Sequence, residues 1–209
     1  DAWKRATPAP HVVLAHSMGG QLAMRALVEK AMDPDAVALS APMLGIQTGG
    51  LPLALNHAVA KLIVALGKGK QAAWKVSEKP LSPMSMRGKM LTHDDDRYED
   101  EIAWWALRPE VKLGPPSWHW VERAMASIRL LERPGALEAV QTPILLLATT
   151  ADQLVSTKRV IADSKRLPHA ETLIFGEEAA HELLREADGV RDQCLKRIDA
   201  FLDQHAPRP

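Results

Sequence analysis

The sequence contains little that would point to a secreted, membrane-spanning or nucleic-acid-binding protein. Its 209 residues include one cysteine, Cys194, so no disulfide can form within the chain and nothing favours an oxidising compartment. The 26 Lys and Arg residues balance the 26 Asp and Glu residues, which argues against a nucleic-acid partner and against a disordered acidic tail. No apolar run approaches the ~20 residues that a membrane-spanning helix needs. We therefore expect a globular protein that is cytoplasmic or membrane-peripheral, with no obligate protein partner evident.

The sequence also lacks an initiator methionine and a signal-peptide pattern, and it opens with Asp1-Ala2-Trp3. A buried strand is predicted as early as residue 12, and a parallel strand needs neighbours with which to pair. We therefore expect the sequence to be the C-terminal part of a longer protein that supplies further strands.

Short apolar runs alternate with helical patterns at both ends of the chain. They predict strands over residues 12–16, 36–40, 144–148 and 172–175, and helices over residues 18–31, 156–166 and 188–204. The strand 12–16 contains the apolar run 12–15, so it is expected to be apolar and buried on both faces. Strand–helix–strand units build parallel sheets. The prediction is an α/β core, formed by residues 1–42 and 134–209.

Residues 43–133 contain no convincing strand. Helices are predicted over 98–107 and 120–131, after an apolar helical stripe made of Leu55, Val59, Leu62, Ile63 and Leu66. This region holds five of the six tryptophans. Such tryptophans are more often part of the core packing than in contact with substrate. We predict a helical cap inserted into the α/β core. Tryptophans also suit a lipid interface, so transient contact of the cap with a membrane surface stays open.

A serine follows the first predicted strand, in the order His16-Ser17-Met18-Gly19-Gly20. A strand, a tight turn and a helix hold such a serine hydroxyl exposed beside a helix N-terminus. Both glycines are expected at points where side chains would collide as helix and strand pass closely. The usual motif is Gly-x-Ser-x-Gly, in which this chain has Ala15 at the first glycine.

A serine hydroxyl needs a base to remove its proton and an acid to orient that base. Both should lie on loops after the carboxyl ends of the later strands. Asp152 follows the strand 144–148, and His181 follows the strand 172–175. The order along the chain is Ser17, Asp152, His181, as in the α/β-hydrolase arrangement.

Other roles stay open for the acidic candidates. Asp152 could instead cap a helix or be a solvated loop carboxylate. Asp163 falls in the middle of a predicted helix, away from any strand end. The acidic run Asp94-Asp95-Asp96 suits a solvated face or a helix start, and its combination with His93 has no metal-ligand spacing.

Structural roles are open for the remaining candidates as well. Ser17 could be an ordinary turn serine, and His181 an ordinary loop histidine. His16 is predicted to point away from the serine and to be structural. Cys194 fits a buried helix face and needs no chemistry.

Four core segments occur together in the order typical of one branch of the α/β-hydrolases. Residues 16–20, 39–43 (Leu-Ser-Ala-Pro-Met), 151–155 (Ala-Asp-Gln-Leu-Val) and 180–184 (Ala-His-Glu-Leu-Leu) resemble the lysophospholipase and monoacylglycerol lipase branch. Residues 91–94 (Leu-Thr-His-Asp) and 114–118 (Gly-Pro-Pro-Ser-Trp) resemble cap segments of the bacterial lysophospholipase L2-like group.

The resemblance implies that Ser17 is the nucleophile, His181 the general base and then acid, and Asp152 its orienter. The backbone N–H of Met18 would be one oxyanion donor, and a second would come from a loop after an early strand that this sequence does not include. The implied function is hydrolysis of a small lipid-like ester, a lysophospholipid or monoacylglycerol, without metal or cofactor. The predicted cap would cover the acyl chain. Alternatives are a small-ester esterase, a peptidase, or a non-catalytic fragment.

Overall fold

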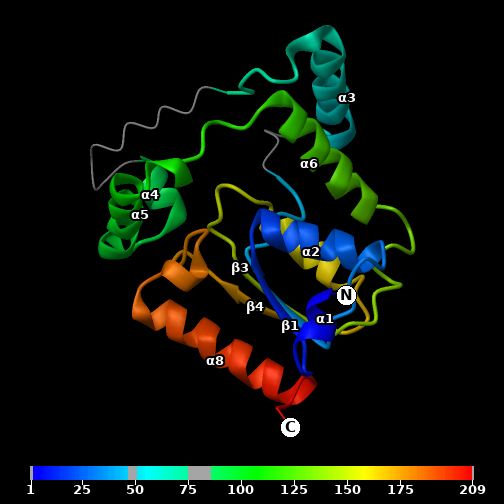
Figure 1. Cartoon of the computed structure of the whole chain (residues 1–209), viewed down its shortest axis with the longest axis vertical. Helices are drawn as coiled ribbons and strands as arrows, with labels where there is room; N and C mark the ends of the chain where they lie inside the picture. The colour runs from blue at the N-terminus through cyan, green and yellow to red at the C-terminus, as the bar shows by residue number, and fades with distance from the viewer. Residues whose placement is uncertain (1, 47–50, 75–85, 209) are drawn as a thin grey trace.

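Four parallel strands form one sheet in the computed structural model, which describes residues 2–46, 51–74 and 86–208 (Figure 1). They are β1 (Val12–His16), β2 (Ala36–Ser40), β3 (Ile144–Thr149) and β4 (Ala170–Phe175), adjacent in that order. The register places His16 opposite Ser40 and Thr149 opposite Phe175. The carboxyl ends of all four strands therefore meet at one edge, and the predicted α/β class is confirmed.

Helices cover both faces of this sheet (Figure 1). On β2, Val37 and Leu39 pack toward α2 (Met18–Val28) and α7 (Thr157–Ser164), whereas Ala36 and Ala38 pack toward α8 (Asp188–His205). Successive residues of a strand point to opposite faces, so a strand covered on both sides is apolar throughout. Cys194 is fully buried among the apolar residues of α8, as predicted.

The prediction that residues 12–16 are buried on both faces was wrong. Val12 and Leu14 are 38% and 55% exposed, while Val13 and Ala15 pack against the core. Among the described strands, β2 is the only neighbour of β1, and α8 packs against β2 and β3. One face of β1 therefore remains accessible.

Several helix boundaries differ from the predicted ones. The helix after Ser17 ends at Val28 rather than residue 31, because Lys30 adopts a left-handed φ of 53°. The helix predicted over residues 156–166 is α7, which begins at Thr157. The Ser156 hydroxyl caps it by accepting a hydrogen bond from the Arg159 N–H. A short α1 (Ala2–Ala6) precedes the sheet.

Helices and loops make up the described part of residues 43–133, and none of the four strands lies there. This part contains α3 (Leu53–Ile63), the π-helical turn η1 (Val64–Lys68), α4 (Met86–Leu91), α5 (Asp95–Leu107), the 3₁₀ turn η2 (Pro109–Val111) and α6 (Trp118–Leu131). Gly67 has a left-handed φ of 78° within η1. In Figure 1, α3 and α6 lie side by side, away from α4 and α5. The division into an α/β core and a cap stays a prediction, and α6 contacts both α2 and α3.

The apolar stripe of α3 does not face the interior. Its inward face carries His57 and Ala60, which pack toward α6, whereas Leu55, Val59 and Leu62 are exposed. Among the described residues, no helix has the length and apolar character needed to cross a membrane.

Candidate active site

Ser17 occupies the sharp turn between β1 and α2. Its φ of 49° and ψ of −116° lie where non-glycine residues are strained. Hydrogen bonds fix this backbone, since the Ser17 N–H donates to the Ser40 carbonyl at 3.0 Å and the Ser17 carbonyl accepts from the Met43 N–H at 2.9 Å. The turn holds the serine hydroxyl at the carboxyl edge of the sheet.

The two glycines after Ser17 are not equivalent. A Cβ on Gly20 would lie 2.8 Å from the Pro42 Cβ, closer than the chain could accept without moving. A Cβ on Gly19 would lie 3.8 Å from the Ala15 Cβ, which is ordinary contact. The predicted steric requirement therefore holds for Gly20 but not for Gly19.

The structure brings Ser17, His181 and Asp152 into one hydrogen-bonded row. His181 Nε2 lies 2.9 Å from Ser17 Oγ, and His181 Nδ1 lies 2.7 Å from Asp152 Oδ2. His181 and Asp152 are both buried. This is the geometry in which an imidazole can accept a serine proton while a carboxylate orients the ring.

Backbone amides hold the second oxygen of Asp152. Its Oδ1 accepts hydrogen bonds from the N–H groups of Leu154 at 2.8 Å and Val155 at 2.9 Å. The carboxylate thus orients both its own loop and the imidazole of His181. Because the two oxygens have separate partners, the orientation of the carboxyl group is fixed.

The competing acidic residues lie elsewhere. Asp163 is buried on α7, where Arg159 donates to it at 2.9 Å, and burial is the main cause that raises its pKa. Asp94 caps α5 by accepting from the Arg97 N–H at 3.0 Å. His93 Nδ1 lies 3.0 Å from Glu186 Oε1. Neither acidic residue is placed beside Ser17.

His16, for which only a structural role was predicted, lies beside the site. Its ring centre lies 4.8 Å from that of His181. The pKa of His16 is lowered to about 4, chiefly because surrounding protein desolvates its ring, and also because His181 carries like charge when protonated. A neutral His16 adds no repulsion when His181 becomes an imidazolium. Its position directly before Ser17 in the sequence is the signal that could have identified it.

A cavity of about 610 Å³ opens beside Ser17 and His181. Its remaining lining comes mostly from α6 and two loops: Met43, Ile46, Asn56, Trp74, Trp120, Val121, Ala124, Met125, Gln153, Leu154 and Val155. This lining is largely apolar. The α3 stripe predicted to cover an acyl chain contributes none of it, because that stripe faces outward. Trp74 and Trp120 do line the cavity, whereas Trp118 packs between helices.

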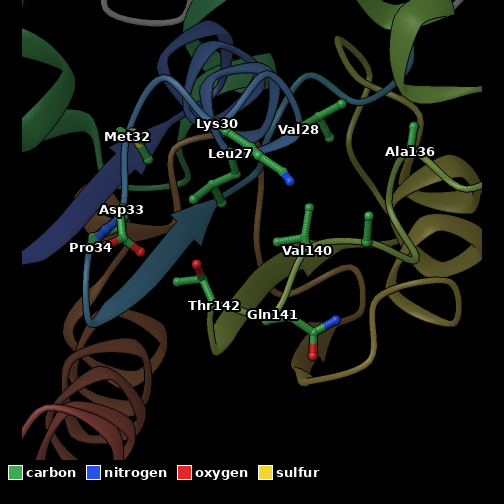
Figure 2. Close-up of a pocket in the computed structure, with 11 residues that line it drawn as sticks. Leu27, Val28, Lys30, Met32, Asp33, Pro34, Ala136, Val140, Gln141 and Thr142 are labelled. Atoms are coloured by element: carbon green, nitrogen blue, oxygen red, sulfur yellow. The ribbon is translucent and has the colours of Figure 1, made fainter.

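A second cavity, of about 490 Å³, lies at the amino ends of β2 and β3, away from Ser17. Figure 2 shows its lining from the end of α2 and from the segment that leads into β3. Its charged residues are Lys30 and Asp33, and Asp33 is also bonded by Lys4. This cavity has no nucleophile paired with a base, so it is not the catalytic candidate.

Comparison with known proteins assigns the chain to a family. The family described as "Serine aminopeptidase, S33" matches residues 2–188. The chain belongs to this family. It is 30% identical over 210 residues to lysophospholipase L2 of Escherichia coli K12, and 26% identical over 204 residues to a probable lysophospholipase L2 of Haemophilus influenzae. These alignments cover 92% and 91% of the chain but only 57% and 59% of the relatives, so the chain spans less than two thirds of their length.

Solved structures support the fold. A soluble variant of monoglyceride lipase from Saccharomyces cerevisiae superimposes with a TM-score of 0.73 at 15% identity, covering 98% of this chain and 65% of that one. A carboxyl esterase from Bacillus coagulans gives 0.68 at 19% identity, covering 98% and 67%. The four parallel strands and their helices are therefore part of an α/β-hydrolase fold.

Proposed function

We propose that this chain carries the catalytic triad of a serine hydrolase that cleaves carboxylic esters. The observation that supports it most is the row of hydrogen bonds Ser17–His181–Asp152 beside an apolar cavity. In this proposal His181 Nε2 takes the proton of Ser17 Oγ as the oxygen attacks the acyl carbonyl. Asp152 stabilises the imidazolium, which then protonates the leaving alcohol. Water attacks the acyl-enzyme by the same steps and restores Ser17.

The N-terminus of α2 is the proposed oxyanion site. Met18 is the first residue of this helix, and N–H groups in a first helical turn lack partners within the helix. The backbone N–H of Met18 therefore suits the developing negative charge beside Ser17. The Met18 side chain is held to one side, since its Sδ accepts a hydrogen bond from Trp120 Nε1 at 3.2 Å.

The proposed substrate is a lysophospholipid or a monoacylglycerol. A cavity lined by aliphatic, aromatic and methionine side chains favours a hydrocarbon chain over a polar group. Relatives named lysophospholipase L2 and a fold neighbour named monoglyceride lipase support the same class of substrate.

We also propose transient contact with a membrane surface. The exposed stripe of α3 and η1, made of Leu55, Val59, Leu62 and Leu66, runs beside the exposed lysines Lys61 and Lys68. Leucines beside lysines suit insertion at an anionic lipid surface. This face is distinct from the cavity lining, so a membrane could be engaged while the cavity holds an acyl chain.

The substrate proposal can be tested with parallel substrates. Lysophosphatidylcholines and monoacylglycerols of increasing acyl length are compared with acetate esters and aminoacyl amides. We expect hydrolysis that increases from acetate to medium and long acyl chains and that Ser17→Ala abolishes. The matched control is Ser164→Ala on α7, whose hydroxyl bonds only the Ile161 carbonyl among the contacts described. Preferential cleavage of acetate esters or of aminoacyl amides would contradict the lipid assignment.

A further inference from the structure

The catalytic histidine lies in a loop whose backbone is bonded to the segment that ends α4. The His181 N–H donates to the Met90 carbonyl at 3.3 Å, and the Glu182 N–H donates to the Leu91 carbonyl at 2.7 Å. The preceding Ala180 N–H donates to Glu186 Oε1 at 2.6 Å. Three successive amides around His181 are therefore fixed by groups outside the triad.

Glu186 connects the same two segments through its side chain. Its carboxylate is fully buried. Oε1, which accepts from Ala180, lies 3.0 Å from His93 Nδ1, and Oε2 accepts from the His93 backbone N–H at 3.1 Å. A buried carboxylate is tolerated only when hydrogen-bond donors surround it. Here the donors come from the catalytic loop and from residue 93.

Further bonds make the connection rigid. The Thr92 hydroxyl donates to the Arg185 carbonyl at 2.7 Å, and the Arg97 guanidinium donates to the Glu186 carbonyl. In return, the Arg185 guanidinium donates to the Arg97 carbonyl. Residues 90–97 and 180–186 thus hold each other through main-chain and side-chain bonds in both directions.

From this network we propose that Glu186 and residues 90–93 are positioning residues for His181. They do not touch the reacting atoms, and none of them lines the cavity beside Ser17. Their function is to fix the loop so that Nε2 stays within reach of Ser17 Oγ. The predicted cap would then contribute to catalytic geometry as well as covering substrate. This inference rests on the proposed hydrolase function, and it assigns a role to the 91–94 segment that the triad leaves unexplained.

The most informative substitutions are at His93, whose side chain is half exposed and can be changed with little risk to folding. His93→Ala removes the Nδ1 donor to Glu186 but keeps the backbone donor. His93→Asn replaces it with an amide N–H near the same place. A misplacement of ~1 Å costs about 100-fold in rate, so a smaller displacement in His93→Ala should slow fluorophosphonate modification of Ser17 by about 10-fold or more. His93→Asn should recover most of that rate.

Glu186→Gln tests the other partner of the same contact. Donors approach both carboxylate oxygens, so the amide NH₂ must face at least one N–H group. We expect a lower kcat for ester hydrolysis with KM unchanged, because the cavity is intact. Glu171→Gln is the matched control: Glu171 also bonds a histidine and an arginine, His205 and Arg197, but between β4 and α8. It should leave kcat unaltered.

A spectroscopic measurement separates this inference from the proposed function. The Nδ1 proton shared by His181 and Asp152 should give a far-downfield proton resonance, which does not require turnover. We expect that resonance to shift or broaden in His93→Ala and to return in His93→Asn. An unreactive wild-type chain with this response would count against the hydrolase proposal alone. An unchanged resonance and an unchanged modification rate in folded His93→Ala, or no recovery in His93→Asn, would overturn the positioning role.

Discussion

Replacing Asp152 by asparagine should remove the basicity of His181 without removing its neighbours. The Asp152 Oδ1 position receives two backbone N–H groups, from Leu154 and Val155, so the asparagine carbonyl oxygen must occupy it. The NH₂ group then takes the Oδ2 position, 2.7 Å from His181 Nδ1. Nδ1 must accept from that NH₂, which leaves the ring proton on Nε2, facing Ser17. The base is then in the wrong tautomer.

The expected loss of rate is large because the asparagine amide cannot flip: a flipped NH₂ group would face the N–H donors of Leu154 and Val155. The equivalent substitution in serine proteases costs about 10⁴-fold in kcat, which corresponds to about 5.5 kcal/mol at 1.36 kcal/mol per tenfold. The assay is the rate of ester hydrolysis and of fluorophosphonate modification, with the thermal midpoint measured on the same samples. We expect both rates to fall together while cooperative unfolding is retained.

Asp163→Asn is the matched control for Asp152→Asn. Asp163 is also a buried carboxylate, but its partners are arginines on and beside α7. This variant can lose stability and should keep its rate once folded. If folded Asp152→Asn retained a tenth or more of the wild-type rate, Asp152 would not be the orienting acid.

The remaining predictions concern packing, pH and the lipid surface. Gly20→Ala should destabilise the chain by about 1–3 kcal/mol in denaturant unfolding, through overpacking against Pro42, whereas Gly19→Ala should not; equal effects would contradict the assigned close approach. Because the pKa of His16 is lowered from 6.5 to about 4 on folding, its contribution to stability is complete above pH 6.5 and is lost as the pH falls toward 4. His16→Gln should flatten the dependence of the unfolding midpoint across this range, and an unchanged slope would refute the shift. Replacing both Leu62 and Leu66, which are 60% and 65% exposed, by serine should lower the affinity for anionic phospholipid vesicles in a sedimentation assay by about tenfold or more. Serine at the exposed Leu195 of α8 is the control and should leave this affinity unchanged. Equal binding of both variants would exclude the α3 face as the membrane contact.

The hydrogen-bonded row of Ser17, His181 and Asp152 was predictable because its geometry follows from chain topology. Parallel strands bring their carboxyl ends to one edge, so residues that follow three different strands must lie close together. Ser17, Asp152 and His181 each follow such a strand, and the structure places them within hydrogen-bond distance. The positions of the four strands could also be read from short apolar runs, and the structure has β1, β2, β3 and β4 at those places.

Features that depend on which neighbour is present were not predictable in the same way. An apolar run such as 12–16 does not reveal whether helices cover both its faces, and the exposure of Leu14 contradicted the expectation. Likewise, helical periodicity identified the α3 stripe but could not say that the other face, with Ala60, would pack on α6. The role of Glu186 depends on its contact with His93, which lies 93 residues away in the sequence. No pattern within a short stretch of sequence predicts such a long-range contact.

Whether Ser17 is an activated nucleophile is tested most directly by intact-mass analysis after incubation with a fluorophosphonate. We expect this activation to give one covalent adduct on the wild-type chain, none on Ser17→Ala, and an undiminished adduct on Ser164→Ala. A cooperatively folded wild-type chain that gains no adduct, or a Ser17→Ala variant that is still modified, would contradict it.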